Sequence, residues 1–121
     1  MSWQLRQYLE VYDEFCVSIQ HDSELRGQID RRLAHLLERG NLTREPVSKP
    51  VEDGIFECRA KSARHQARLL YCFLPGKQIV ILLGILKDQK KLARADIDEA
   101  KRRRDIIEAQ REFLNGLHKT H

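Results

Sequence analysis

The stretch ARLLYCFLPGKQIVILLGILK, residues 67–87, decides the fold of this protein. Two apolar runs within it are separated by Pro75-Gly76, a pair that favours a turn slightly longer than a two-residue hairpin loop. Runs of this kind, rich in Ile, Val, Leu and aromatic residues, are typical of β-strands. The second run, QIVILLGILK, is almost uninterrupted, which predicts a strand covered on both faces. We therefore expect two consecutive antiparallel strands here.

A third strand is predicted just before this pair, at residues 55–61 (IFECRAK). Polar and apolar residues alternate in it, which is the pattern of a strand with one buried face. The alternation places Arg59 and Lys61 on the face opposite to the buried one. The preceding residues 41–54 contain two prolines and end in Asp53-Gly54, which predicts a connector without regular structure.

Helical periodicity occupies both ends of the chain. Apolar residues at spacings of three and four predict a helix over residues 2–20 and a second helix that follows a cap at Asp22 or Ser23 and stops at Gly40. Residues 1–40 are therefore expected to form an antiparallel helical hairpin. The same period returns at residues 94–115 and predicts a C-terminal helix.

The predicted order is two helices, an antiparallel sheet of three or four strands within residues 54–88, and one helix, which belongs to the α+β class. A small sheet with an apolar face needs a layer over it, and the helical hairpin supplies this layer. The far face is then expected to collect the outward side chains on a concave, open surface. With 121 residues, the chain has the size of one ordinary domain.

Positive charge is concentrated in the middle of the chain. Residues 55–94 carry nine Lys and Arg residues against two acidic residues, Glu57 and Asp88, although the net charge of the whole chain is only +4. Such a block is typical of a protein with a phosphate-rich partner. The groups expected to converge at one end of the open sheet face are Arg59, Lys61, Arg64, His65, Arg68 and Lys87.

Other classes of protein are disfavoured. The longest uncharged apolar run, residues 79–86, is far shorter than the ~20 residues that cross a bilayer, and the start MSWQLRQYLE lacks the apolar core of a signal peptide. We therefore expect a cytoplasmic protein without a membrane partner. Cys16, Cys58 and Cys72 have no CxxC spacing and lie in apolar patterns, as reduced core thiols do. No metal site and no cofactor is predicted.

A composite motif runs through the predicted strands. Its residues are Asp53, Gly54, Glu57 and Arg59, then Arg68, Leu70, Tyr71 and Phe73, then Gly76, residues 79–84, Lys87 and Lys91. In order and spacing, residues 47–107 resemble the core of the RelE/ParE superfamily of bacterial toxins, specifically its HigB-like, phage-derived branch. The departures from that branch are Ala67, Leu83, Asp88 and Leu92-Ala93. The usual N-terminal first strand is not predicted either, because helical periodicity begins almost at once.

The resemblance implies the toxin of a type II toxin–antitoxin pair, an endoribonuclease that cleaves ribosome-bound mRNA and so inhibits translation. It also implies a hetero-oligomer with a helix-turn-helix, HigA-like antitoxin. RNA cleavage without a metal needs a base for the 2′-hydroxyl, positive charge at the phosphorane and an acid for the leaving oxygen. Arg59 and Arg68 are predicted to stabilise the phosphorane, because a guanidinium binds phosphate bidentately and stays charged. Lys87, Lys91 and His65 are the candidates for proton transfer.

Contacts to mRNA or ribosomal RNA are predicted for Lys61, Arg64, Tyr71, Lys90, Arg102 and Arg103. Tyr71 is either a core residue or a platform on which a base stacks. Each of these cations, Lys61 included, can instead be an ordinary solvated charge. Two functional alternatives stay open. One is a non-nuclease toxin that binds DNA gyrase, as in the ParE arm of the superfamily. The other is an inactive prophage remnant that only binds its antitoxin.

Overall fold

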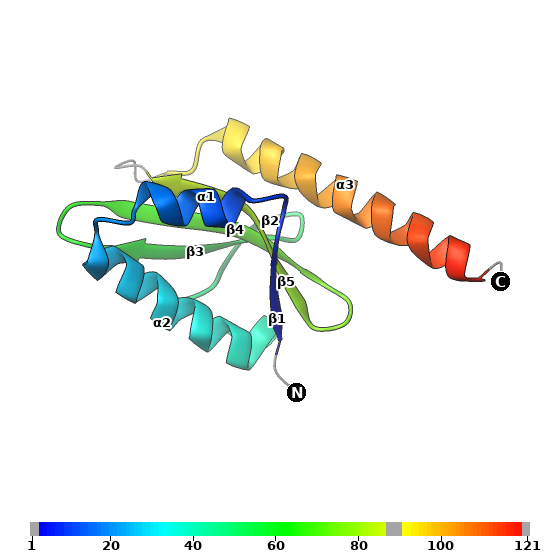
Figure 1. Cartoon of the computed structure of the whole chain (residues 1–121), viewed down its shortest axis with the longest axis horizontal. Coiled ribbons are helices and arrows are strands. Elements are labelled where there is room, and N and C mark those ends of the chain that lie inside the picture. The colour runs from blue at the N-terminus through cyan, green and yellow to red at the C-terminus, as the bar shows by residue number, and fades with distance from the viewer. Residues whose placement is uncertain (1–2, 87–90, 120–121) are drawn as a thin grey trace.

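The protein contains a five-stranded mixed sheet, and the α+β class expected from the sequence is confirmed (Figure 1). The computed structural model describes residues 3–86 and 91–119, with side chains described as far as Arg111. The strands are β1 (Gln4–Gln7), β2 (Lys49–Glu52), β3 (Ile55–Lys61), β4 (Gln66–Leu74) and β5 (Gln78–Leu86). Their order is β1-β5-β4-β3-β2, with β1 parallel to β5 and all other neighbours antiparallel. The three predicted strands are present, and two short strands flank them.

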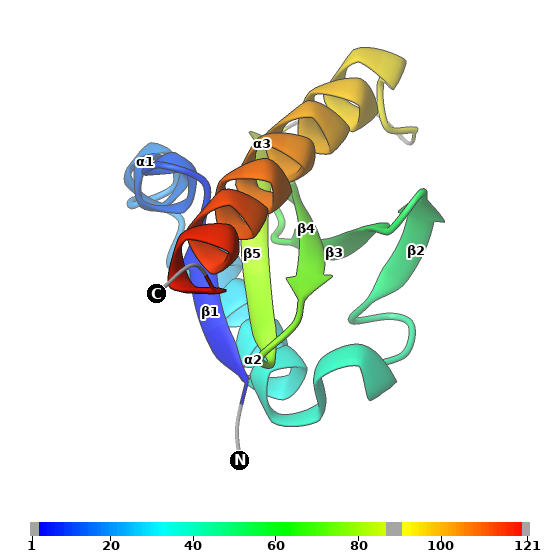
Figure 2. The same cartoon turned by 90° about the vertical axis from the view of Figure 1, so that its right-hand side faces the viewer.

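Helices cover both faces of the sheet (Figure 2). The helices α1 (Val11–Ser18) and α2 (Ser23–Arg39) share one core cluster with Leu69 and Ile81, whereas α3 (Arg94–Lys119) shares the other with Leu70 and Leu82. The expected two-layer arrangement with an open far face is therefore wrong. Both faces of β4 and β5 are apolar, and burying the second face requires α3 as a third layer.

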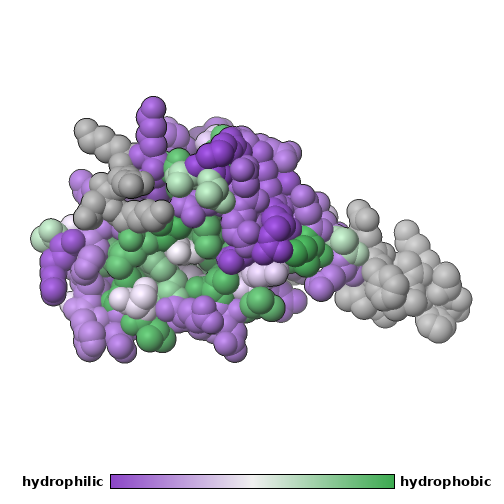
Figure 3. Space-filling model, turned by 90° about the horizontal axis from the view of Figure 1, so that it is seen from above, coloured by the Kyte–Doolittle hydropathy of each residue, from purple (hydrophilic) through white to green (hydrophobic). Residues whose placement is uncertain are grey.

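The outer surface of α3 is mostly hydrophilic, and an apolar strip lies between α3 and α1 (Figure 3). Ile97 and Ala100 of this helix are buried, and Ala100 packs in the cluster that α3 shares with the sheet. This amphipathic pattern is the signal that predicted a helix at residues 94–115, and the helix does begin at Arg94. No helix within residues 3–86 and 91–119 is long and apolar enough to cross a membrane.

The N-terminal segment forms a strand before its first helix, so the expected continuous helix over residues 2–20 is wrong. After β1, the Tyr8 N–H donates to the Ile81 carbonyl at 2.8 Å, which continues the pairing with β5. Leu9 has a φ of 49°, outside the range of an α-helix, and α1 begins only at Val11. Leu5 and Tyr8 face different core clusters, as residues of a strand can. The expected helical hairpin is thus one strand followed by two helices, and both helices contact the sheet.

The strand β2 departs from the prediction of an irregular connector over residues 41–54. A 3₁₀ turn at Gly40–Leu42 follows α2, and β2 pairs with β3 through Lys49 and Glu57. Pro50 is tolerated because β2 lies at the edge of the sheet. The pairing goes no further along β3, so no strand of the described chain covers the edge of β3 from Cys58 to Lys61.

Turn and cap predictions are confirmed. Asp22 caps α2 by accepting a hydrogen bond from the Leu25 N–H at 3.0 Å, and Gly40 follows the last residue of α2. Asp53 and Gly54 both have positive φ values, 48° and 77°, as in the tight turns of β-hairpins. The loop between β4 and β5 comprises residues 75–77 and is longer than a two-residue turn.

Two of the three cysteines are core thiols. Burial raises the pKa of Cys58 to about 11 and the pKa of Cys72 to about 12, so both thiols stay protonated and unreactive at neutral pH. Cys16 is half-buried, and all three cysteines are free thiols.

Candidate functional site

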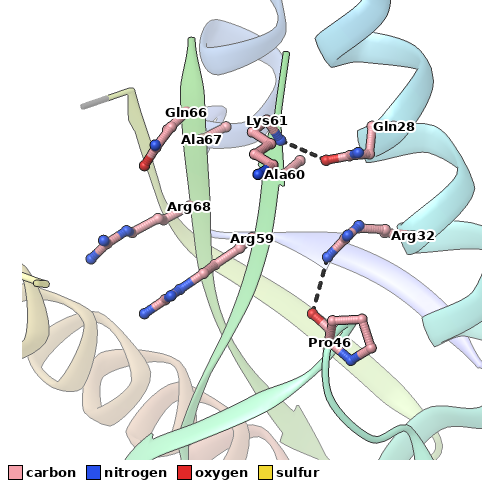
Figure 4. Close-up of a pocket in the computed structure, with 9 residues that line it drawn as sticks. All are labelled: Gln28, Arg32, Pro46, Arg59, Ala60, Lys61, Gln66, Ala67 and Arg68. Atoms are coloured by element: carbon pink, nitrogen blue, oxygen red, sulfur yellow. Dashed lines mark hydrogen bonds between the residues drawn. The ribbon is translucent and has the colours of Figure 1, made fainter. Parts of the chain in front are cut away.

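Two arginines lie directly opposite each other on β3 and β4. The strand register pairs Arg59 with Arg68, and opposed residues of an antiparallel pair have Cβ atoms about 5 Å apart on the same face. Both side chains leave the sheet in the same direction (Figure 4). Like charges placed opposite each other destabilise a sheet. The arrangement therefore needs a counter-charge.

Glu57 supplies this counter-charge from the same face of β3. Its side chain is only 1% exposed, and its Oε1 accepts a hydrogen bond from Arg59 Nε at 2.5 Å. Its Oε2 lies 3.8 Å from Arg68 Nη1 and has no hydrogen bond from any described residue. The side chain of Arg59 is 49% exposed, whereas that of Arg68 is 6% exposed. The three side chains together carry one net positive charge, and Arg59 is the accessible member.

The arginine pair borders a pocket of about 460 Å³ at the uncovered edge of β3. Its polar lining consists of Gln28 and Arg32 from α2, Arg59 and Lys61 from β3, and Gln66 and Arg68 from β4. Arg32 lies on the other side of β3 from Arg59, where its Nη1 donates to the Pro46 carbonyl at 3.0 Å (Figure 4). Among the described residues, the lining holds four cations and no carboxylate. The pocket is therefore a concentrated positive site within the usual size range of ligand sites, about 300 to 1,000 Å³.

Asp22 ties the turn between β3 and β4 to the N-terminus of α2. Its buried carboxylate accepts a hydrogen bond from Ser62 Oγ at 2.6 Å and lies 2.7 Å from His65 Nδ1. His65, a predicted proton-transfer residue, is thus oriented through Nδ1, which leaves Nε2 as the atom that faces other partners. His65 precedes Gln66 of the pocket in the chain but is not part of the pocket lining. Arg64, in the same turn, is exposed.

We expect Asp22 to contribute stability that is lost as the pH falls from about 4 to about 2. Hydrogen bonds from Ser62, His65 and the Leu25 N–H lower the pKa of the Asp22 carboxyl from 3.8 to about 2. A carboxyl with a lowered folded-state pKa stabilises the protein above its unfolded-state pKa, and this contribution disappears as the pH falls through the folded-state value.

Urea unfolding midpoints across this pH range, measured for the wild-type protein and for Asp22→Asn, test the contribution. Asparagine caps a helix about as well as aspartate does, so the variant removes the charge and keeps the cap. The midpoint should fall more steeply with decreasing pH in the wild-type protein. Parallel curves for the two proteins would contradict the role of Asp22.

Tyr71 lies in the core, on the face of the sheet opposite to the arginine pair. Its side chain is fully buried, its ring stacks on Phe56 at 6.0 Å and meets Phe73 edge-on at 5.6 Å. Its hydroxyl forms a hydrogen bond with Ser48 Oγ, and burial raises the pKa of Tyr71. This placement agrees with the core alternative for Tyr71 and presents no ring face to a base.

Arg103 anchors α3 to the sheet. Its Nη1 donates to the Leu82 carbonyl at 2.7 Å, and its guanidinium lies 5.1 Å from the centre of the Tyr8 ring. Leu82 is the residue of β5 without a Cα partner at a register irregularity, so Arg103 occupies a carbonyl next to the disrupted ladder. Arg102 is more exposed, and its Nη2 lies 2.6 Å from Glu99 Oε2.

The remaining predicted cations occupy different surroundings. Lys61 is exposed at the rim of the pocket, and its backbone N–H donates to Gln28 Oε1 at 2.5 Å. Lys91 is exposed just before α3. Lys87 and Lys90 lie outside the described residues.

Several residues of the site were missed as site residues by the sequence reasoning. Glu57 shares the strand alternation with Arg59, so the pattern of β3 contained a signal that these two side chains lie on one face. Asp22 was recognised only as a helix cap. Arg32 and Gln28 reach the pocket because α2 packs beside β3, and no local sequence signal indicates that packing.

No group of three or more His, Cys, Asp or Glu side chains in the described part of the chain is arranged to hold a metal ion. No curated protein matches the chain. Residues 20–105 match the family described as Phage derived protein Gp49-like (DUF891). This match spans more than half of the 121 residues and contains Asp22, Glu57, Arg59, His65 and Arg68. The chain therefore belongs to the phage-derived Gp49-like protein family.

Proposed function

We propose that the protein is the toxin of a type II toxin–antitoxin pair and that it cleaves mRNA bound to the ribosome. The observation that carries this proposal is the positive pocket at the edge of β3, where three elements bring together Arg32, Arg59, Lys61 and Arg68. Membership of the phage-derived Gp49-like family and the resemblance to HigB-like toxins of the RelE/ParE superfamily support the same function.

The proposed reaction is attack of a ribose 2′-oxygen on the adjacent phosphorus. The new O–P bond displaces the 5′-oxygen, which leaves with a proton from a general acid after a general base has taken the 2′-hydroxyl proton. Arg59 is suited to contact the phosphorane, because its guanidinium is half exposed at the pocket. Arg68 is nearly buried and adds a fixed positive charge behind Arg59.

Proton transfer is assigned to His65 and Lys91, with Lys87 as a third candidate. Histidine is the side chain best suited to move protons near neutral pH, and Asp22 fixes the ring of His65 by a 2.7 Å contact at Nδ1. Lys91 is exposed and close in sequence to the end of β5, the strand that pairs with β4. The exposed cations Lys61, Arg64 and Arg102, together with Lys90, are proposed to contact phosphates of mRNA or ribosomal RNA.

The proposed partner in the resting cell is a helix-turn-helix, HigA-like antitoxin, and the complex is a hetero-oligomer in the cytoplasm. A pocket whose described lining holds four cations and no carboxylate favours an acidic segment, since complementary charge speeds association and sets the register of binding. Such a segment would compete with RNA for the same surface.

Primer-extension mapping of mRNA ends after induced expression in bacteria tests the proposed function. We expect defined cuts within translated regions, and we expect Arg59→Ala to abolish them. Arg31→Ala is the matched control, because it removes the same charge from an exposed position of α2 outside the pocket lining.

Growth arrest with intact messages would contradict nuclease activity. It would favour a toxin that binds DNA gyrase, which a supercoiling assay detects. Normal growth on induction would instead indicate an inactive prophage remnant that only binds its antitoxin.

A further inference from the structure

Glu57 occupies a position that stability alone does not explain. Its carboxylate is almost completely buried, yet only one of its two oxygens has a hydrogen bond from the described residues. Replacing a buried ion pair by apolar residues of similar volume is often neutral or stabilising. An apolar residue at 57 and neutral residues at 59 and 68 would therefore build the same sheet at a lower cost in desolvation. The retained group of charges indicates a role in the chemistry of the pocket.

The hydrogen-bond geometry shows what Glu57 does to Arg59. Glu57 contacts the guanidinium through Nε, at 2.5 Å, and not through either terminal nitrogen. The edge formed by Nη1 and Nη2 is thereby left for a ligand, and arginine can bind two oxygens of one phosphate through this edge. Glu57 itself is 1% exposed, so a substrate does not reach its carboxylate.

The charge of Glu57 acts against RNA binding at the same time. Glu57 lies 2.5 Å from Arg59 and 3.8 Å from Arg68, and it reduces their combined charge from two to one. A single-stranded polyanion is attracted in proportion to the positive charge that it meets. The same side chain therefore weakens attraction to RNA and fixes the direction of the guanidinium that faces the phosphate.

We propose that Glu57 is a positioning residue that lowers RNA affinity and raises the rate of cleavage by holding Arg59 with its Nη1–Nη2 edge toward the pocket. The effect of Glu57 on the cleavage rate rests on the proposed nuclease function. The effects of Glu57 on the orientation of Arg59 and on RNA affinity rest on the geometry alone. Geometry of this kind matters because a misplacement of about 1 Å at a reacting group can reduce a rate about 100-fold.

Glu57→Gln and Glu57→Asp separate position from charge. Glutamine keeps the side-chain length but removes the charge, so its amide oxygen accepts only a weaker, uncharged hydrogen bond from Arg59 Nε. Aspartate keeps the charge and is one methylene too short for the contact with Arg59. Glu108→Gln is the matched control, since it makes the same change at an exposed position of α3. Circular dichroism and thermal unfolding of all variants show whether each folds.

Cleavage and binding are expected to move in opposite directions in Glu57→Gln. The single-turnover rate on ribosomes programmed with one message should fall at least tenfold. The affinity for a fluorescent RNA oligonucleotide, measured by anisotropy, should rise several-fold, with a log–log salt slope steeper by about 0.7 for one additional phosphate contact. Glu57→Asp should lose rate without gaining affinity, and Glu108→Gln should behave as the wild-type protein does.

A loss of both rate and RNA affinity in Glu57→Gln would show a purely structural role and overturn the proposal. A rate equal to that of Glu108→Gln would also overturn it. If the wild-type protein does not cleave RNA at all, the proposed function fails. The hold of Glu57 on the Arg59 side chain is then tested separately, by NMR. The Nε–Hε signal of Arg59 in ¹⁵N NMR spectra should be protected from solvent exchange in the wild-type protein and lose that protection in Glu57→Asp, whose carboxylate is too short to reach Nε. Equal protection in both would refute the positioning role.

Discussion

Replacing Arg59 with alanine is expected to slow mRNA cleavage on ribosomes by about 100- to 1,000-fold, or about 3 to 4 kcal/mol of transition-state stabilisation. The guanidinium of Arg59 is half exposed at the pocket and is held through Nε, so its terminal nitrogens can follow the charge that develops on the phosphorane. Single-turnover kinetics on programmed ribosomes measure this loss directly. A rate within threefold of the Arg31→Ala control would exclude Arg59 from the chemistry.

Arg59 is more accessible to a substrate than Arg68, whose side chain is almost completely buried. Arg68 is 6% exposed and lies 3.8 Å from the buried Glu57, so Arg68→Ala removes a partner of a buried carboxylate. Breaking a buried ion pair in this way typically costs about 3 to 5 kcal/mol of folding stability. Lost activity in Arg68→Ala would therefore combine unfolding with chemistry. Arg59→Ala also removes a partner of Glu57, the hydrogen-bond donor at 2.5 Å, so thermal unfolding of both variants is needed to separate lost folding from lost chemistry.

Replacing Gly40 with alanine is expected to lower the free energy of unfolding by about 2 to 4 kcal/mol. Gly40 follows α2 with a φ of 57° and ψ of −131°, a conformation that side chains with a Cβ rarely adopt. A Cβ at Gly40 would lie 1.9 Å from Cε2 of the Trp3 indole, so the ring that packs on this glycine would have to move. Because Trp3 leads into β1 and its N–H donates to the Leu37 carbonyl at 3.1 Å, the displacement also loosens the first strand.

Gly27→Ala provides the matched control for Gly40→Ala. Gly27 lies inside α2, where a Cβ would come no closer than 3.2 Å to the mobile end of the Arg31 side chain. Alanine in a helix interior is more stable than glycine by about 0.5 to 1 kcal/mol, so this variant should be slightly stabilised. Urea unfolding of both variants measures the two effects. Similar midpoints for the two variants would show that Trp3 does not constrain Gly40.

Local patterns in the sequence predicted a large part of the fold. The uninterrupted apolar run of β5, the alternation of β3 and the cap at Asp22 act through neighbours within a few residues, and the two strands and the cap are confirmed. The expected single buried face of β3 is wrong, because Ile55 and Glu57 on its other face are buried as well. The two short strands were missed for physical reasons. The apolar spacing around Leu5 and Tyr8 fits a helix as well as a strand, and only pairing with β5 selects the strand. Pro50 argued against a strand, and only the edge position of β2 permits one.

The two arginines of the candidate site were predicted from the sequence. The position of the pocket and the elements that surround it were not. Arg59 and Arg68 were expected to converge at one end of the same sheet face, and the structure makes them direct cross-strand neighbours. The expected open face is instead partly covered by α3, and the accessible pocket lies at the edge of β3 with Arg32 of α2 as a further cation. The burial of the Arg68 side chain and the hydrogen bond from Arg103 to the Leu82 carbonyl likewise follow from packing between elements.

The sequence by itself determined the α+β class, the central strands, the second and third helices, and the concentration of positive charge that points to a phosphate-rich partner. These features arise from periodicity, turn chemistry and composition, which act within a few residues. Only the tertiary structure decided that α3 partly covers the second face of the sheet, that β2 stops short and leaves β3 from Cys58 to Lys61 without a strand partner at that edge in the described chain, and that Glu57 lies buried beside two arginines. Burial and contacts between distant segments depend on how all the layers pack together. No pattern within a few residues of sequence specifies this packing.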